Sequence, residues 1–262
     1  MSRRLSGMRA IVTGSSSGVG RAVAIELQAR GVNVLATARR AVRLAELADA
    51  CRPRTAASVM LHEAGDITDA TFRESLVRTA VERLGGVDLV VAAAGSGAIG
   101  RFDEMPSETF RAVLEIDLVA PAELIRTALP HLAVGRDPAV VLVGSILGYH
   151  PLPLHTAYCA AKAGIVSLAG SMRQELLAEK IDVLLASLGP TESEFWDSLL
   201  AGERPAWSRG RPMSAAATAR AIVDGLERRR REVIPGWQSK GFVFAARHLG
   251  WLIDAILARR PR

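Results

Sequence analysis

The sequence has few cysteines, few aromatic residues and no long uninterrupted apolar segment. Only two of its 262 residues are cysteines, Cys51 and Cys159, which argues against a disulfide framework and favours a reducing compartment. No apolar run approaches the roughly 20 residues that a membrane-spanning helix needs. The first residues lack the apolar core of a signal peptide, so we expect no cleaved leader and a cytoplasmic protein.

The net charge of +6 does not by itself indicate a nucleic-acid partner. The arginines are scattered, and aromatic residues, which stack on bases, make up only 5% of the chain. The densest basic run, 228–231, follows a predicted helix, where cations suit the negative end of the helix dipole. We therefore expect no nucleic acid among the partners, and no metal site.

What the chain does contain is a regular alternation of short apolar segments with longer helical ones. Hydrophobic residues make up 49% of the sequence, enough for a sizeable core in one domain spanning 1–262. Strands are predicted at 10–13, 33–37, 59–62, 89–92, 140–143, 183–187 and 232–234, and helices at 19–30, 42–50, 69–84, 107–132, 156–179 and 214–230. The strands are mostly apolar, as strands covered on both sides must be. This order predicts an α/β fold with a parallel sheet of about seven strands and helices on both faces.

The first predicted strand runs into a glycine-rich turn, 13–20, which then opens a helix. Glycines let the backbone turn sharply and approach a pyrophosphate, which the free N–H groups of the helix N-terminus attract. Such a turn alone is a weak signal, because any tight turn uses glycine. Its position after the first strand strengthens the interpretation as a nucleotide site.

The ends of the second and third strands carry the next polar groups. An acid after the second strand would bind a ribose 2′-hydroxyl, whereas Ala38 and Arg39 stand there, and arginine suits a 2′-phosphate. We therefore predict NADP(H) as the preferred cofactor, with NAD(H) as the alternative. Asp66, after the third strand, is placed to accept a bond from an adenine amine; the alternative is that it caps the following helix.

Three polar residues in the second half of the chain indicate carbonyl/alcohol redox chemistry. Tyr158 and Lys162 are four positions apart, hence on one face of a helix, and Ser145 lies thirteen positions upstream. A free tyrosine titrates near pH 10, so a tyrosine base at neutral pH needs roughly 4 kcal/mol of differential stabilisation. A neighbouring ammonium and an oxidised nicotinamide ring are suited to share that task, while Ser145 holds the substrate oxygen.

These features together resemble the short-chain dehydrogenase/reductase family over residues 8–195. The matching segments are the turn at 13–20, the acid Asp66, the segment 92–95, the Ser145, Tyr158 and Lys162 set, and the Pro-Gly-like segment 188–193. The resemblance implies a Rossmann-type doubly wound sheet, a nicotinamide cofactor, an oxidoreductase activity and a homodimer or homotetramer.

The resemblance also implies a role for each matched residue. Tyr158 is expected to be the general acid or base, Lys162 to bind the nicotinamide ribose and lower the pKa of Tyr158, and Ser145 to polarise the carbonyl. The residues expected to bind the cofactor are Gly14, Ser16, Gly18, Val19 and Gly20 at the pyrophosphate, Arg39, Asp66 and Ile67 at the adenosine end, Ala94 and Gly95 beside its ribose, and Thr191 and Ser193 near the nicotinamide.

The sequence departs from the family pattern most clearly at Asp117. Relatives have an asparagine there that completes a proton relay to the lysine, and an ionised acid cannot donate a hydrogen bond. The relay is thought to use the main-chain carbonyl, which Pro121 should leave without a helical partner. Our hypothesis is that the relay survives with a shifted pH profile and that Asp117 counts among the catalytic residues.

Ala92 and Ala93 replace asparagines and Leu188 a proline, and we expect only a small stability change at the alanines.

The substrate is predicted to be a lipophilic ketone, aldehyde or alcohol. The segment 146–155 between Ser145 and Tyr158 is largely apolar and is expected to wall the pocket, with His155 interpreted as a structural histidine in preference to a substrate contact. Residues 196–212 are expected to cover the substrate, with Trp196 and Trp207 as pocket walls or as packing within this lid.

The alternative function is a nicotinamide-binding regulator or scaffold with little turnover, motivated by Asp117 and the alanine segment.

The C-terminal segment 236–262 is predicted to form an amphipathic helical tail. Its apolar residues share one helical face: Phe242, Ala245, Leu249, Leu252, Ile253, Ile256 and Leu257. Docking of this face on its own domain or on a sister subunit is the favoured interpretation. Peripheral membrane contact is the alternative, and it would suit a substrate that partitions into lipid.

Overall fold

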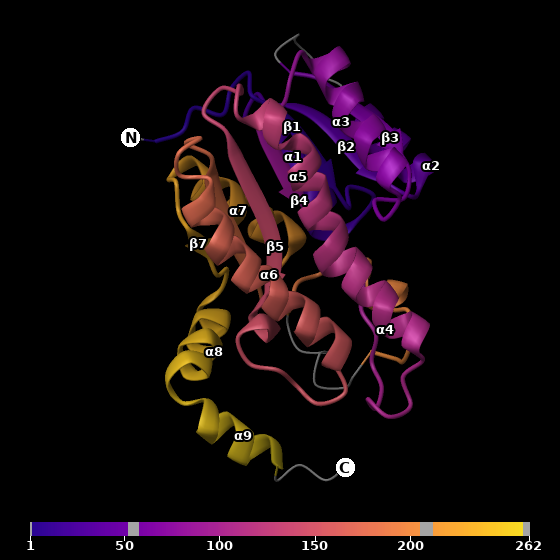
Figure 1. Ribbon diagram of the computed structural model, residues 1–262, viewed down its shortest axis with the longest axis vertical. Helices are drawn as coiled ribbons and strands as arrows, with labels where there is room; N and C mark the ends of the chain where they lie inside the picture. The colour runs from indigo at the N-terminus through magenta and orange to yellow at the C-terminus, as the bar shows by residue number, and fades with distance from the viewer. Residues whose placement is uncertain (1, 52–57, 205–211, 259–262) are drawn as a thin grey trace.

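The computed structural model of the protein describes residues 2–51, 58–204 and 212–258 and contains one seven-stranded sheet (Figure 1). The strands are β1 (Arg9–Thr13), β2 (Asn33–Ala38), β3 (Met60–Ala64), β4 (Leu89–Ala92), β5 (Ala139–Ser145), β6 (Asp182–Leu188) and β7 (Glu232–Val233). Their order is β3-β2-β1-β4-β5-β6-β7 and every pairing is parallel. The predicted parallel sheet is therefore confirmed.

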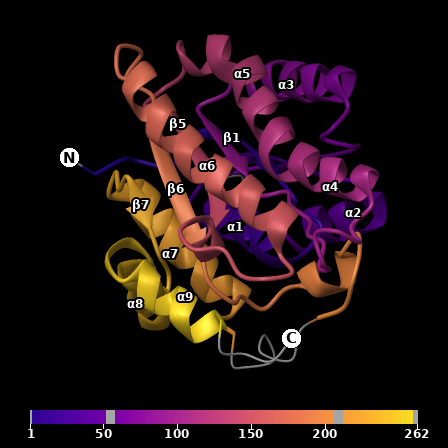
Figure 2. The same ribbon diagram turned by 60° about the horizontal axis from the view of Figure 1, so that its bottom comes forward.

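Helices cover both faces of this sheet, and each face has its own apolar cluster. The first face carries α1 (Gly18–Ala29), α2 (Ala41–Ala50) and α7 (Ala215–Glu227), whose leucines and valines pack on β1, β2 and β6. The second carries α3 (Ala70–Leu84), α5 (Ala120–Leu132) and α6 (Thr156–Glu175), packed on β4, β5 and the other sides of β1 and β2. Figure 2 shows α3, α5 and α6 side by side on this second face. The prediction of a doubly wound sheet is confirmed.

The strand order places a crevice at the end of the sheet where the carboxyl ends of the strands lie. After β3 the chain crosses over β1 and β2 to begin β4 on the other side of β1, so connections leave β1 and β4 in opposite directions. Loops that diverge at the carboxyl ends of two neighbouring strands leave an opening between them, which is where open α/β sheets bind ligands. The loops after β1, β4 and β5 meet at this point.

The long middle helix predicted at 107–132 is interrupted by a π-helical turn. α4 (Ser107–Leu114) passes into the π turn η1 (Glu115–Val119) and then into α5. The N–H of Ala120 donates to the carbonyl of Glu115, five residues back, and Pro121 has no N–H with which to continue the α-helical pattern. The interruption centres on Asp117.

Two other predicted helices end earlier than expected. α6 ends at Glu175, not 179, and α7 ends at Glu227, not 230. In each case the chain then turns through a non-glycine residue with positive φ, Lys180 at 57° and Arg229 at 51°. Arg229 lies within the predicted range of α7, and a left-handed residue cannot continue a right-handed helix, so that helix was predicted too long. Lys180 lies beyond the predicted end of α6, which passes into a turn at 176–180.

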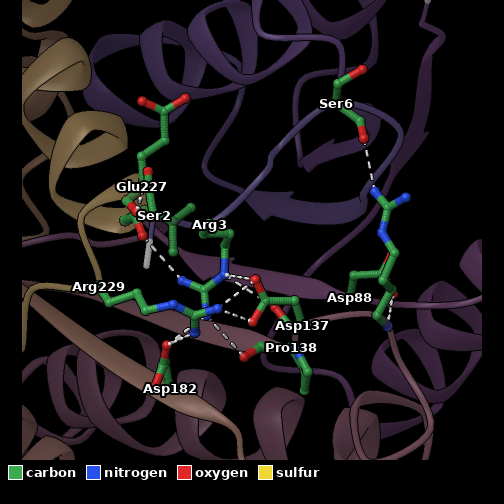
Figure 3. Close-up of polar contacts among 11 residues, drawn as sticks. Ser2, Arg3, Ser6, Asp88, Asp137, Pro138, Asp182, Glu227 and Arg229 are labelled. Atoms are coloured by element: carbon green, nitrogen blue, oxygen red, sulfur yellow. Dashed lines mark hydrogen bonds and ion pairs between the residues drawn. The ribbon is translucent and has the colours of Figure 1, made fainter.

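At the amino end of the sheet a buried arginine joins distant segments (Figure 3). The Arg3 side chain is fully buried; its Nη2 donates to Oδ2 of Asp182 at 2.7 Å and its Nη1 to the carbonyl of Leu226 at 3.1 Å. Arg229 reaches the same Asp182 at 2.7 Å and Asp137 at 2.6 Å. The first residues of the chain are thereby tied to β6 and α7.

The C-terminal segment forms two helices, α8 (Trp237–His248) and α9 (Gly250–Ala258), which meet at an angle of 101°. Within residues 2–51, 58–204 and 212–258 no single helix is long and apolar enough to cross a bilayer, although α8 and α9 together have the length and composition. Because the axis bends, the seven apolar residues predicted to share one face do not all do so. Leu249, Leu252 and Ile256 are exposed at 38%, 41% and 52%, and of these three only Ile256 also lines the cavity together with the remaining four.

Candidate active site

The glycine-rich turn between β1 and α1 forms a cradle that only glycines permit. Gly14 and Gly18 have φ values of 70° and 54°. A Cβ on Gly14 would lie 2.8 Å from the carbonyl oxygen of Ala93, and one on Gly20 would lie 2.4 Å from that of Gly14. Ser17 does not cap α1 with its side chain, so the first N–H groups of this helix remain directed at the crevice. The turn fits a pyrophosphate.

A cavity of about 840 Å³ runs from this cradle to the C-terminal helices. Every residue that the sequence predicted for the cofactor or for catalysis lines this cavity, except Asp117. The matched residues come from the carboxyl ends of β1 to β6, from the segments that follow them, and from α1 and α6. The sheet topology therefore gathers side chains that are up to 179 positions apart, from Gly14 to Ser193, around one space.

Arg40 lies at the end of the cavity where the adenosine is expected. Its guanidinium forms hydrogen bonds and an ion pair with the residues around it. Its Nη2 donates to the hydroxyls of Ser16 and Ser17 at 3.0 and 2.6 Å, and its Nη1 pairs with Oε2 of Glu194 at 2.6 Å. Arg40 lowers the pKa of Glu194, which therefore carries a charge at neutral pH. From the sequence only Arg39 was predicted to bind the cofactor here, and Arg40 was not. Its place directly after Arg39 was the available signal.

Asp66 and Asp69 precede α3, and the sequence left open whether Asp66 caps this helix or faces the adenine. Asp69 caps α3 by accepting from the N–H of Thr71 at 2.8 Å. Asp66 Oδ1 accepts from both the N–H and the hydroxyl of Thr68 at 2.9 Å, and Asp66 lines the cavity. The cap is thus Asp69, and Asp66 faces the space where the sequence analysis expects adenine.

Ser145, Tyr158 and Lys162 lie together at the centre of the cavity. Ser145 ends β5, whereas Tyr158 and Lys162 occupy the first two turns of α6. Lys162 Nζ lies 5.6 Å from the centroid of the Tyr158 ring and donates to the carbonyl of Val143 at 3.2 Å. The helical spacing of four positions predicted this proximity, and the structure confirms it.

Asp117 lies behind this set, completely buried. Its Oδ1 accepts from the N–H of Ser96 at 2.9 Å and lies 3.6 Å from Lys162 Nζ, while Oδ2 has no hydrogen-bond partner among the described residues. A Cβ on Gly95 would lie 2.7 Å from Oδ1, so this glycine makes room for the carboxyl group. Burial raises the pKa of Asp117 and outweighs the opposing charge of Lys162.

The pKa of Tyr158 differs from the expectation. Burial of the hydroxyl raises it well above the usual value near 10, the charge of Asp117 raises it further, and a hydrogen bond with Ser145 opposes both. The net direction is upward in the protein alone, and the lowering by Lys162 that the resemblance implies stays a prediction. A positive charge placed near the hydroxyl would oppose this rise in the pKa of Tyr158, because it favours the phenolate.

The substrate side of the cavity is mostly apolar. Leu147 and Leu152 come from the segment between Ser145 and Tyr158, and Phe195, with its ring centroid 5.5 Å from that of Tyr158, comes from the turn η3 (Glu194–Ser198). His155 is buried, with Nδ1 2.7 Å from the carbonyl oxygen of Pro153, and its burial lowers its pKa.

The remaining walls come from the lid and the tail. Trp196 lines the cavity, whereas Trp207 lies outside the described residues. α8 and α9 contribute Phe242, Ala245, Ile253, Ile256 and Leu257. The tail therefore packs on its own domain, as favoured from the sequence, and in addition closes one end of the cavity, which the sequence did not predict.

Comparison with known proteins assigns this arrangement to a family. The family model for short chain dehydrogenases matches residues 8–204. The chain belongs to the short-chain dehydrogenase/reductase family. A short chain dehydrogenase of Pseudocercospora fijiensis is 34% identical over 193 residues, which cover 73% of this chain and 62% of that protein. An uncharacterized oxidoreductase of Myxococcus xanthus is 33% identical over 71% of this chain and 72% of its own length.

Solved structures of the family agree with the fold. A short-chain dehydrogenase from Streptomyces avermitilis superposes with a TM-score of 0.81 at 27% identity, covering 96% of each chain. An alcohol dehydrogenase from Thermococcus sibiricus, complexed with 5-hydroxy-NADP, superposes with a TM-score of 0.78 over 87% of this chain. The family model ends at residue 204, so α7, α8 and α9 lie beyond its match.

Proposed function

We propose that the protein is an NADP(H)-dependent oxidoreductase that interconverts a lipophilic ketone or aldehyde and its alcohol. The observation that carries this proposal is the position of the Ser145 and Tyr158 side chains. Both lie where the glycine-rich cradle and the apolar part of one cavity meet. A carbonyl group at this point is within reach of both hydroxyls, while its apolar substituents face Leu152 and Phe195.

In this proposal the chain's residues hold the substrate oxygen and move one proton. Ser145 donates a hydrogen bond to the carbonyl oxygen, and Tyr158 donates its hydroxyl proton to that oxygen during reduction. During alcohol oxidation Tyr158 accepts the proton instead. The nicotinamide cofactor supplies or accepts the hydride when it is bound. Lys162, on the face of α6 that carries Tyr158, binds the cofactor ribose.

The preference for NADP(H) is supported by two arginines at the end of β2. Arg39 lines the cavity, and Arg40 places its guanidinium against Ser16 and Ser17 of the cradle. A planar guanidinium binds a phosphate through paired hydrogen bonds. The structural relative from Thermococcus sibiricus is complexed with an NADP derivative, which accords with this preference. Thr37, at the same end of β2, also lines the cavity. Its buried hydroxyl has no partner in the described part of the chain and is therefore available to a bound cofactor.

The test is cofactor turnover measured by absorbance. NADPH consumption, and NADP⁺ reduction in the reverse direction, are followed with a panel of lipophilic ketones, aldehydes and secondary alcohols. Replacement of Tyr158 by Phe removes only the hydroxyl and is expected to lower kcat by a factor of about 10²–10⁴. Turnover that persists in the Y158F variant would contradict the proposal.

A second candidate is a nicotinamide-binding regulator with little turnover. The observation that favours it is the buried Asp117 beside Lys162, which raises the pKa of the tyrosine that would have to act. Cofactor binding without turnover of any panel member in either direction would support this second function.

Assembly and location complete the proposal. We expect a homodimer or homotetramer, formed as in relatives through the exposed sides of α5 and α6. We place the protein in the cytoplasm because Cys51 and Cys159 are both free and buried, which suits a reducing environment.

A further inference from the structure

α8 and α9 carry a second apolar surface in addition to the side that closes the cavity. Trp237, Phe244 and Trp251 are 80%, 62% and 70% exposed, and Leu252 and Ile256 are about half exposed. Trp237 and Phe244 are seven positions apart in α8, so both lie on one side of that helix. We call the segment 237–258 the C-terminal cap. Figure 1 shows it at the end of the molecule opposite α3.

We infer that the exposed side of the C-terminal cap binds an anionic lipid surface. The inference concerns residues beyond the match to the family model, and its lipid-binding part stands independently of the proposed function. Its second part, entry of substrate from the lipid, rests on that proposed function.

The shape of the cap suits a position within the membrane interface. α8 has 12 residues and α9 has 9, and the bend of 101° between them prevents one straight helix of about 20 residues. Short helices with an apolar side insert shallowly at the level of the lipid head groups. Tryptophan is enriched at that level because its ring is apolar and its N–H is polar. Trp237 and Trp251 fit this preference.

The charges of the cap favour anionic lipid over a second copy of the chain. At neutral pH the described part of the cap carries two cations, Lys240 and Arg247, and one acid, Asp254; Arg247 is paired with Glu232 of the domain, and Asp254 lies 3.2 Å from His150. The sequence then adds Arg259, Arg260 and Arg262. Two copies apposed through this basic segment would repel one another, whereas an anionic bilayer attracts it.

Contacts on the other side hold the cap to the domain. Arg247 pairs with Glu232 at 3.0 Å and lies 4.8 Å from the centroid of the Tyr149 ring. The Tyr149 hydroxyl in turn donates to Glu232. These contacts join α8 to β7 and to the segment after β5, so the cap is seated beside the segment that follows Ser145.

A single helix of the cap, α9, separates the proposed lipid surface from the cavity. Ile253 and Leu257 line the cavity one helical turn apart. Ile256 also lines the cavity, and 52% of its surface is accessible to solvent. A lipophilic molecule dissolved in the bilayer would therefore meet α9 first and Ser145 and Tyr158 behind it.

From the sequence, docking was favoured over membrane contact, and all apolar residues of the tail were assigned to one helical face. The bend at Leu249 and Gly250 instead gives the tail two apolar surfaces. One set of apolar side chains lines the cavity, and another set, which includes the exposed aromatic residues Trp237, Phe244 and Trp251, stays outside.

The test is sedimentation of the full chain with vesicles of phosphatidylcholine, with and without phosphatidylserine. The variant Phe244→Ser/Trp251→Ser removes two exposed aromatic residues. Val134→Ser is the matched control, since Val134 is 84% exposed on a loop after α5. We expect the wild-type chain and the control to sediment with phosphatidylserine vesicles and the double variant to bind at least tenfold less, with high salt weakening the wild-type binding.

Wild-type protein that stays in the supernatant with both kinds of vesicle would overturn the inference, as would a double variant that sediments like the control. A loss of oligomer in the double variant, measured by sedimentation velocity without lipid, combined with no vesicle binding by the wild type, would identify the surface as a subunit interface instead. Vesicle binding requires no turnover, so it fails or succeeds separately from the proposed enzyme activity.

The substrate-entry part is tested by turnover of an active lipophilic substrate supplied in vesicles or in solution. The double variant is expected to lose activity at least fivefold toward the vesicle-borne substrate and to keep its activity toward the dissolved one. Equal losses in both formats would contradict entry through the lipid.

Discussion

Lys162 Nζ lies 3.6 Å from Oδ1 of Asp117, so the cation beside Tyr158 faces a carboxyl group on its far side. A neutral amide at position 117 would leave the charge of Lys162 directed at Tyr158 alone. The carboxyl group is buried and has one oxygen without a partner among the described residues, so no solvent or further donor weakens its effect on the tyrosine.

Asp117→Asn is therefore expected to lower the pKa of Tyr158, because the charge that raises it is removed. For alcohol oxidation the active form of Tyr158 is the phenolate, so the rising limb of the kcat/KM profile should move to lower pH. For reduction the active form is the phenol, so the falling limb should move the same way. The measurement is the pH dependence of kcat/KM, and Glu108→Gln, an exposed acid at the start of α4, serves as control. An unchanged profile would show that the charge of Asp117 is irrelevant.

Arg40 and Glu194 are predicted to act in opposite directions on NADPH binding. Arg40→Ala removes a charge-assisted contact to the 2′-phosphate and should raise the KM for NADPH about tenfold or more, with little effect on the KM for NADH. Glu194→Gln frees the Arg40 guanidinium from its ion pair and should lower the KM for NADPH.

Arg39→Ala shows whether the neighbouring arginine contributes equally, and Arg83→Ala, an exposed arginine in the last turn of α3, is the control. Equal changes in the KM values for NADPH and NADH in the R40A variant would be evidence against recognition of the 2′-phosphate.

Arg3 is predicted to be a major contributor to stability. Its buried guanidinium donates to Asp182 and to the carbonyls of Leu226 and Pro138, and Arg3→Met leaves these acceptors without that donor. The free energy of unfolding, measured with urea, should fall by about 2 kcal/mol. Arg229 still pairs with Asp182, which limits the loss. Arg4→Met, one position along and exposed, should change stability by less than about 0.5 kcal/mol; equal effects would refute the assignment.

Asp88 is predicted to make stability depend on acid pH. Burial alone would raise its pKa, but hydrogen bonds from the Arg9 side chain and from the N–H groups of Arg136 and Arg9 leave the pKa below the usual value. A depressed folded-state pKa adds stability above the unfolded-state value near 4, and that stability is lost as pH falls through the folded-state value. Asp88→Asn should lower the free energy of unfolding by about 2 kcal/mol at pH 7.

The difference between wild type and D88N should shrink below about pH 4, where the wild-type carboxyl group also becomes neutral. Urea titrations at several pH values measure this, with Glu82→Gln on the exposed side of α3 as control. A difference that is the same at pH 3 and pH 7 would mean that the charge of Asp88 is not what stabilises the fold.

The sequence by itself determined the elements, their order and the main chemical groups. Apolar strands alternating with amphipathic helices specify a parallel sheet covered on both faces, because both surfaces of each strand must be buried. The glycines at 14, 18 and 20 and the spacing of Tyr158 and Lys162 are local features. A shared helical face depends only on residues close in the chain, so the proximity of Tyr158 and Lys162 was predicted correctly, and the sharp turn expected of the glycines is found as positive φ values at Gly14 and Gly18.

The tertiary structure alone decided which distant groups meet. Three features depend on contacts between segments far apart in the chain: Arg40 reaches the cradle, Asp117 faces Lys162, and α8 and α9 close the cavity. The pKa of Tyr158 belongs to this class as well, because desolvation is set by everything packed around the hydroxyl, and a sequence pattern does not contain that environment.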